Sequence, residues 1–227
     1  MLLALDCSYQ TASGALARGD GTLVASFTRP PGTWRGERLI DELAELLAGA
    51  GADWRELEAL AVSIGPGRFT GVRTAVALAR AVGLATGLPV YAVSTLETLA
   101  ALAASDPATS PLLALLPGKK GEVYAQRFHP DGSPAEPATA RSPADLAAVL
   151  RPPLRLVGPR AAWQAIPGAD RVAHTDSGPH ALGVLRAALR RRAAGGEPAP
   201  ASSVSPLYLR APDADPGAGR PLIASTA

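Results

Sequence analysis

The sequence predicts an α/β protein of two lobes, and three observations support this prediction. A chain of 227 residues, 47% of them hydrophobic, has enough apolar material for one sizeable core or two small ones. Short apolar runs typical of buried strands alternate with segments whose apolar residues recur at helical spacing. This pattern divides at Asp106-Pro107. The expected parts are a first lobe (1–105), a second lobe (106–210) and a disordered tail rich in Ala and Pro (211–227).

The first lobe is expected to run β-β-β-α-β-α-β-α. Its strands are predicted from apolar runs separated by turns, and they cover 2–5, 11–18, 22–28, 57–64 and 88–93. Its helices are predicted from apolar residues at i, i+3 and i+4, and they cover 37–47, 72–86 and a segment after Ser94. Thr70 and Gly87 are the expected N-cap and left-handed C-cap of the second helix. Ser94 and Glu97 form the expected capping box of the third.

The second lobe shows the same kinds of element. Strands are expected over 112–115, 122–128 and 154–157, with a hairpin turn at Asp131-Gly132. Ser142-Pro143 is typical of the N-cap and first position of a helix, which we expect to continue to Leu150. The last helix is expected over about 179–192, and the last ordered segment over 206–210. We find no tandem sequence repeat.

Composition and spacing exclude several classes of function. The net charge of +2 argues against a dedicated nucleic-acid coat, and the one dense basic run, Arg190-Arg191-Arg192, is typical of a helix C-terminus. Cys7 is the only cysteine, and no two of the three histidines lie four residues apart, so we expect no zinc site. The N-terminal apolar run ends at Asp6 without a basic segment, and no run approaches the ~20 residues of a membrane span. We therefore expect a cytoplasmic protein with no signal peptide and no membrane contact.

A glycine-rich turn leads from a predicted strand into a predicted helix; residues 65–71 read GPGRFTG. The turn matches neither the Walker spacing, which needs a Gly-Lys pair, nor the G-x-G-x-x-G of dinucleotide sites. The following helix carries Ala75, Ala79 and Gly83 on one stripe, so another backbone can approach it closely. Spacing alone leaves two interpretations open: the stripe packs against the helix's own sheet, or it meets a partner.

Asp6 and Ser8 are weak candidates for a cofactor site. A strand that ends in a carboxylate and a hydroxyl can face a phosphate tail and its metal, although Asp6 can equally cap the first turn. A phosphotransferase of this β-β-β-α-β-α type would also need a second glycine-rich, acidic loop. The corresponding stretch, residues 131–134, reads as a plain hairpin turn. The sequence therefore contains at most one of the two phosphate-binding segments that such an enzyme needs.

Several segments closely resemble TsaB, the dimerisation subunit of the bacterial machinery that makes N6-threonylcarbamoyladenosine in tRNA. They occur in the family's order and extend from the N-terminus to about residue 210. The segments are 3–8 (LALDCS), 65–73 (GPGRFTGVR), 87–90 (GLPV), 93–97 (VSTLE), 121–124 (GEVY) and 206–210 (PLYLR). The G-P-G-x-F-T-G-x-R segment is the most specific of them.

The resemblance implies an actin-like ATPase (ASKHA) fold with a mixed, helix-flanked β-sheet in each lobe, and a final helix that can pack back on the first lobe. It implies a non-catalytic scaffold that forms a heterodimer with TsaD and is bound by TsaE. tRNA is then reached through the complex, while ATP and metal belong to the partner subunits. We therefore expect no catalytic or metal-binding residue in this chain. The interface is expected at Leu39, Leu43, Phe69, Val72, Arg73, Ala75, Val76, Ala79 and Arg80.

Three positions depart from the family's pattern, namely Gly36, Arg68 and Pro117-Gly118. These departures bear on whether a ligand site is retained, and they do not affect the expected scaffold role. The sequence also leaves open whether the isolated chain forms a homodimer. Three alternatives to a scaffold are an ATPase or kinase of the same fold, a glycoprotease-like zinc peptidase and an independent RNA-binding module. The missing second phosphate loop counts against the ATPase or kinase, and the missing histidine pair counts against the peptidase. The scarcity of clustered basic and aromatic residues counts against the RNA-binding module.

Overall fold

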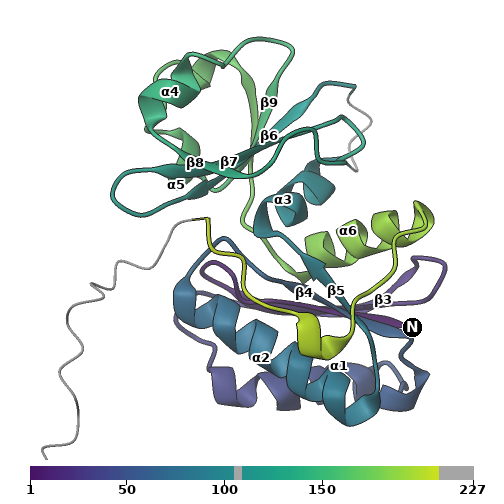
Figure 1. Ribbon diagram of the computed structural model, residues 1–227. Coiled ribbons are helices and arrows are strands. Elements are labelled where there is room, and N and C mark those ends of the chain that lie inside the picture. The colour runs from purple at the N-terminus through teal and green to yellow at the C-terminus, as the bar shows by residue number, and fades with distance from the viewer. Residues whose placement is uncertain (105–108, 210–227) are drawn as a thin grey trace, which may run out of the picture.

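The computed structural model describes residues 1–104 and 109–209. The predicted lobe boundary at Asp106-Pro107 and the tail from residue 210 lie outside the described residues. The described chain forms two five-stranded mixed sheets with flanking helices, one in the lower and one in the upper part of Figure 1. The predicted α/β class, with one mixed sheet in each lobe, is confirmed.

The first sheet has the strand order β3-β2-β1-β4-β5. Its strands are β1 (Leu2–Asp6), β2 (Ala12–Ala17), β3 (Leu23–Arg29), β4 (Ala59–Ser63) and β5 (Val90–Val93). β1 pairs antiparallel with β2 and parallel with β4. Every residue of β1 is buried because helices cover both faces of the sheet, which is the situation that a continuous apolar run predicts.

Three helices cover the first sheet, and they are α1 (Leu39–Gly49), α2 (Phe69–Thr86) and α6 (Ala181–Ala193). The apolar sides of α1 and α2 form one core with Leu3, Leu5 and Val62 on the outer face. α6 comes from the second half of the chain and packs on the inner face, against Leu2 and Ala4.

The second sheet has the strand order β10-β9-β6-β7-β8. Its strands are β6 (Leu112–Pro117), β7 (Val123–Phe128), β8 (Thr139–Arg141), β9 (Arg155–Gly158) and β10 (Ala173–Asp176). Its helices are α3 (Thr95–Ala103) on the inner face, with α4 (Pro143–Ala147) and α5 (Arg160–Trp163) on the outer face.

The two sheets repeat one topology, although the sequence shows no repeat. In each, an antiparallel meander of three strands is followed by two parallel strands that extend the sheet beyond the first strand. The helix after each fifth strand crosses to the other sheet: α3 packs on the second sheet, and α6 packs on the first. The exchange of these two helices ties the lobes together (Figure 1).

Some predicted boundaries were wrong. α2 begins at Phe69 after Arg68, so Thr70 lies inside the helix and is not its N-cap. The N–H of Arg68 donates to the carbonyl oxygen of Ser8 at 2.8 Å, which fixes the turn, and the helix begins three residues before the predicted start at residue 72. Gly87 is the left-handed C-cap as predicted, with φ 75°. The helix that Ser142 caps ends at Ala147 rather than Leu150, and β8, α5 and β10 were not predicted.

Candidate functional site

The glycine turn between β4 and α2 packs against the loop that follows β1. A β-carbon built at Gly67 would overlap the carbonyl oxygen of Ser8, and one at Gly71 would overlap the carbonyl oxygen of Cys7. Gly65 has φ 103°, a conformation that L residues with a side chain rarely adopt. Close approach of two backbones therefore accounts for Gly67 and Gly71, and the backbone conformation accounts for Gly65.

Asp6 and Ser8, the weak cofactor candidates, lie in a buried polar cluster with Ser63. Oδ1 of Asp6 accepts hydrogen bonds from the hydroxyl of Ser8 (2.7 Å), from the Ser8 N–H (3.3 Å) and from the hydroxyl of Ser63. Asp6 Oδ2 has no hydrogen-bond partner within the described part of the chain. Burial raises the pKa of the Asp6 carboxyl, while the hydrogen bonds from the two serines oppose this shift.

The first turn of α6 contacts β2, the strand that pairs with β1 at Asp6. The N–H of Ala181 donates to the hydroxyl of Ser13 at 2.8 Å, and Ser13 is the β2 residue paired with Asp6. Asp6, Ser8 and Ser13 have almost no exposed surface. The chain's own hydroxyls and the first turn of α6 therefore surround these side chains. Among the described residues, no cluster of three or more His, Cys, Asp or Glu could hold a metal ion.

Six of the predicted interface side chains lie in the core of their own lobe. These residues are Leu39, Leu43, Val72, Ala75, Val76 and Ala79, and each is at most 3% exposed. They are buried because the outer face of the first sheet needs apolar cover, which α1 and α2 supply. The stripe of small residues on α2 is also covered by the chain's own short helix η4 (Ala201–Ser203). A β-carbon at Gly83 would lie 2.6 Å from the β-carbon of Ala201 in that helix. This corrects the expectation that these six side chains reach a partner directly.

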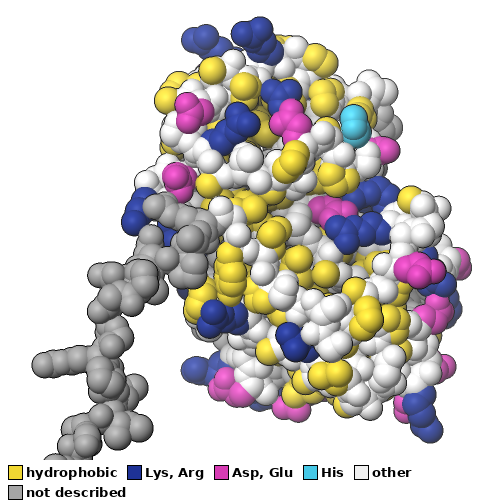
Figure 2. Space-filling view, in the orientation of Figure 1, with side chains coloured by type: hydrophobic (Ala, Val, Ile, Leu, Met, Phe, Trp, Pro, Cys, Tyr) yellow, Lys and Arg dark blue, Asp and Glu magenta, His cyan; other side chains and the backbone are white. Residues whose placement is uncertain are grey.

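The opposite side of α2 is exposed and has little charge. Phe69, Arg73, Ala77 and Leu84 all face outward, at spacings close to a helical repeat. Phe69 is 49% and Leu84 is 64% exposed. Figure 2 shows hydrophobic side chains spread over the visible face of the first lobe, where Figure 1 places α2. An exposed helix face of this composition is typical of a surface that meets another protein.

The N-terminal end of this face carries a cluster that we call the aromatic–arginine patch, formed by Phe69, Arg73 and Tyr208. The guanidinium of Arg73 lies 3.8 Å from the centre of the Phe69 ring, and its Nε donates to the Tyr208 hydroxyl at 2.9 Å. The two aromatic rings stack with their centres 6.0 Å apart. Tyr208 is 46% exposed. Sequence reasoning included Tyr208 only within a family segment, because its distance of 135 residues from Arg73 hides the contact.

The C-terminal segment that supplies Tyr208 is held along the first lobe by hydrogen bonds. Ala199 pairs with Val90, the first residue of β5, and the N–H of Leu207 donates to the carbonyl of Ile64 at 2.7 Å. Arg80 was expected near the edge of the interface, and it instead donates from Nη1 to the carbonyl of Val204 at 3.2 Å. Arg80 therefore fixes this segment, and Phe69 and Arg73 are the predicted interface residues with exposed side chains.

The basic run at the end of α6 makes ion pairs within the chain. Arg190 and Arg191 both contact the buried Glu97, and Arg192 contacts Glu58 at 2.7 Å. These contacts explain the run without an RNA ligand. Among the described helices, none combines the length and the apolar character that a membrane span requires.

Comparison with known proteins identifies the family. The model of the family described as "TsaD: tRNA N6-adenosine threonylcarbamoyltransferase" matches residues 36–165, which is more than half of the chain. The chain belongs to the TsaD family. The TsaB protein of Escherichia coli is 34% identical over 130 residues, covering 57% of this chain and 55% of that protein. An uncharacterised protein of Mycobacterium tuberculosis is 30% identical over 95% of this chain and 94% of its own length.

Solved structures agree with this assignment. YeaZ from Pseudomonas aeruginosa superimposes with a TM-score of 0.77 at 28% identity, covering 92% of this chain and 99% of that one. Component A of the Acidaminococcus fermentans (R)-2-hydroxyglutaryl-CoA dehydratase reaches 0.50 at 12% identity over 85% of this chain and 98% of that one, and it shows the fold alone. The resemblance to TsaB and the actin-like fold are thereby confirmed. The matches to the named TsaB relatives from Escherichia coli and Haemophilus influenzae span about half the length of those proteins.

Proposed function

We propose that this chain is a non-catalytic subunit in the threonylcarbamoylation of N6 of the adenosine next to the anticodon in tRNA. It pairs with TsaD, and TsaE binds the pair. The role belongs to the cytoplasm, where tRNA is modified. Family membership and the names of the TsaB relatives support this function.

The observation that carries the proposal is the exposed face of α2, with the aromatic–arginine patch at its N-terminal end. Interfaces take much of their affinity from a few aromatic and arginine side chains. Here Phe69 and Tyr208 are held in place by Arg73, so little conformational freedom remains to be lost when a partner covers them. We propose this face as the contact with TsaD.

We also propose that the chain itself holds neither nucleotide nor metal, and that both belong to the partner subunits. The burial of Asp6 and Ser8 supports this view, since a phosphate tail cannot reach side chains that α6 and the sheet enclose. It also speaks against the ATPase or kinase alternative, which depended on these two residues.

A reconstituted reaction tests the function. Purified TsaD, TsaE, the carbamoyl-adenylate synthase, ATP, threonine, bicarbonate and unmodified tRNA are expected to form the modified nucleoside when this chain is present. Omission of the chain is expected to abolish the product, which mass spectrometry of digested tRNA measures. Full product formation without the chain would refute the scaffold role.

The contact with TsaD is tested by a Phe69→Ala, Tyr208→Ala double variant. Because both rings are half exposed in the isolated chain, their loss is expected to change the melting temperature little. Loss of a central interface cluster costs about 2 kcal/mol or more, so the Kd for TsaD in calorimetric titration is expected to rise roughly 30-fold.

The matched control is Leu23→Ala. Leu23 is 45% exposed but belongs to β3, the edge strand of the first sheet. We expect its loss to leave the Kd unchanged. If the double variant binds TsaD as tightly as the parent, the partner uses another surface.

A further inference from the structure

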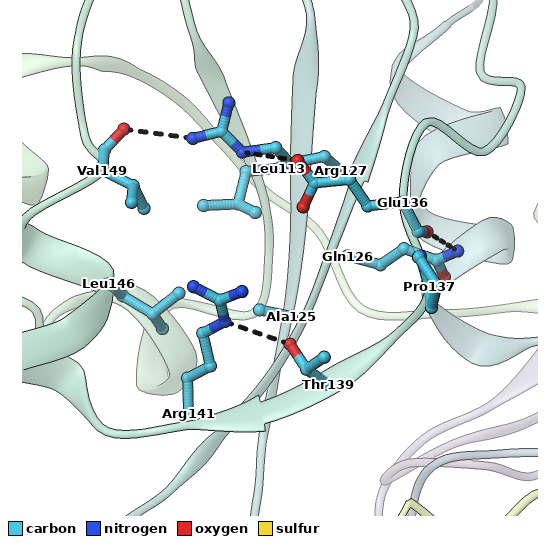
Figure 3. A pocket seen from close by; sticks show the side chains of 10 residues that line it. All are labelled: Leu113, Ala125, Gln126, Arg127, Glu136, Pro137, Thr139, Arg141, Leu146 and Val149. Carbon is cyan, nitrogen blue, oxygen red and sulfur yellow. Dashed lines mark hydrogen bonds and ion pairs between the residues drawn. The ribbon is translucent and has the colours of Figure 1, made fainter.

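The outer face of the second sheet carries a hollow flanked by two arginines, which Figure 3 shows from close by. Arg127 on β7 and Arg141 on β8 both face this side of the sheet. Residues two apart in a strand share a face, so Arg127 lies on the same face as Ala125, and Arg141 on the same face as Thr139. Ala125 lies opposite Thr139 in the register, and its small side chain leaves space between the two arginines. Leu113 and Leu146 supply apolar walls.

The contacts shown for the two guanidinium groups use only part of the five N–H donors of each, and one carboxylate, that of Glu136, lies beside Arg127. Arg127 donates to the carbonyl of Val149 at 3.4 Å, and its Nε lies 3.8 Å from the carboxylate of Glu136, a half-exposed side chain. Arg141 donates from Nε to the neutral hydroxyl of Thr139 at 3.2 Å. Two positive groups thus point toward one partly apolar hollow, where their repulsion is less screened than in water. An anion between them would offset that repulsion and would accept the remaining guanidinium hydrogen bonds.

A second depression continues the hollow past Arg127. It is lined again by Arg127 and Val149, and it adds Arg151 from the loop after α4. We call the continuous surface of Arg141, Arg127 and Arg151 the arginine groove. Cations in a row match the repeating phosphates of a nucleic acid, whereas a single small anion would need only one of these positions.

The arginine groove lies in the second lobe, on the side of the second sheet that α4 covers, whereas α2 covers the outer face of the first sheet (Figure 1). It therefore stays open when a partner covers the exposed face of α2. We propose that the arginine groove binds phosphodiester groups of tRNA. This inference rests on the proposed function, which brings tRNA to the complex, and it goes further by giving this chain a direct contact with the RNA backbone.

The test measures tRNA binding by the complex of the chain with TsaD. An Arg127→Gln, Arg141→Gln double variant removes both charges and keeps polar side chains of similar reach. Because the two arginines face one hollow, they would hold one phosphate between them, so the slope of log Kd against log salt is expected to fall by about 1. At ~0.1 M salt the affinity for an unmodified tRNA transcript is then expected to fall about five- to eightfold.

The matched control is Arg171→Gln, an exposed arginine of the same lobe that precedes β10, at the opposite edge of the second sheet from β8. It changes the net charge without touching the groove, so tRNA affinity is expected to stay within about twofold of the parent. An Arg141→Lys variant retains the charge and is expected to bind tRNA more tightly than Arg141→Gln. Equal losses in the double variant and in the control would overturn the proposal, since they would indicate only a general loss of charge.

Two further measurements separate the sources of phosphate and the two proposals. One outcome would be that inorganic phosphate raises the melting temperature of the parent but not of the double variant, with the two proteins binding tRNA equally tightly. In that case the groove binds free phosphate and the tRNA assignment is wrong. If the chain forms no complex with TsaD, the proposed function fails instead. The same tRNA titration on the isolated chain then tests the arginine groove separately. Weaker binding by the double variant than by the parent would support the groove as a tRNA site, and identical binding would overturn it.

Discussion

A Gly71→Ala substitution is expected to lower the free energy of unfolding by about 3 kcal/mol, the upper end of the usual cost of overpacking. The added β-carbon would overlap the carbonyl oxygen of Cys7. The oxygen is a backbone atom and the backbone fixes the position of the β-carbon, so neither can rotate away. Relief would require α2 to move off the loop after β1, which would also strain the hydrogen bond from the Arg68 N–H to Ser8. For a chain of this size we expect the melting temperature to fall by roughly 6–12 °C.

The control for this substitution is Gly49→Ala. Gly49 ends α1, and a β-carbon there meets no atom within 4 Å. Alanine has the higher helix propensity, so this variant is expected to be as stable as the parent or up to about 1 kcal/mol more stable. If Gly71→Ala melts with the parent, close backbone packing is not the reason for the glycine, and a ligand at the turn would have to be reconsidered.

The first lobe could be predicted well because its elements depend on local patterns. β1 is a continuous apolar run, and α1 and α2 repeat apolar residues at helical spacing, so both element type and order follow from the sequence. The second lobe was harder to predict because several of its elements are too short to show such patterns. β8, α5 and β10 have only three or four residues each, which is too short for a period to show. The duplicated topology is a property of strand order and leaves no repeat in the sequence.

The candidate site could be predicted only in part, because apolar faces indicate burial but not what covers them. The small residues of α2 fit a helix interface and a self-packed helix equally well, and the structure fills that side with its own sheet and η4. The exposed side of the same helix is less apolar, so pattern reasoning gave it less weight. Its aromatic–arginine patch depends on Tyr208, which the C-terminal segment brings to α2 from far along the chain.

Glu97 illustrates how a remote partner changes the role of a correctly predicted residue. The expected cap is half present, since the hydroxyl of Ser94 accepts from the Glu97 N–H at 3.0 Å. The carboxylate of Glu97 does not return the contact. It accepts instead from Arg190 at 2.8 Å and from Arg191, and Nη1 of Arg191 also donates to the carbonyl of Ala92 at 2.7 Å. The Glu97 carboxylate therefore fastens α6 to α3, and Arg191 links α6 to the end of β5.

A Glu97→Gln substitution is expected to lower the free energy of unfolding by about 2–3 kcal/mol. Removing one partner of a buried ion pair typically costs about 3–5 kcal/mol, and we reduce this value because Arg190 and Arg191 are 24% and 39% exposed and keep some hydration. Glutamine preserves the shape and one acceptor oxygen, so the loss reports the charge. Urea unfolding of parent and variant measures it.

Glu58→Gln is the matched control because Glu58 also receives two cations, the N-terminal ammonium at 3.0 Å and Arg192 at 2.7 Å. Its side chain is 49% exposed, compared with 3% for Glu97, and exposed pairs contribute at most about 1 kcal/mol. The difference between the two variants therefore measures what burial adds to the same arrangement of charges. Equal losses would mean that burial adds nothing to the ion pairs of Glu97.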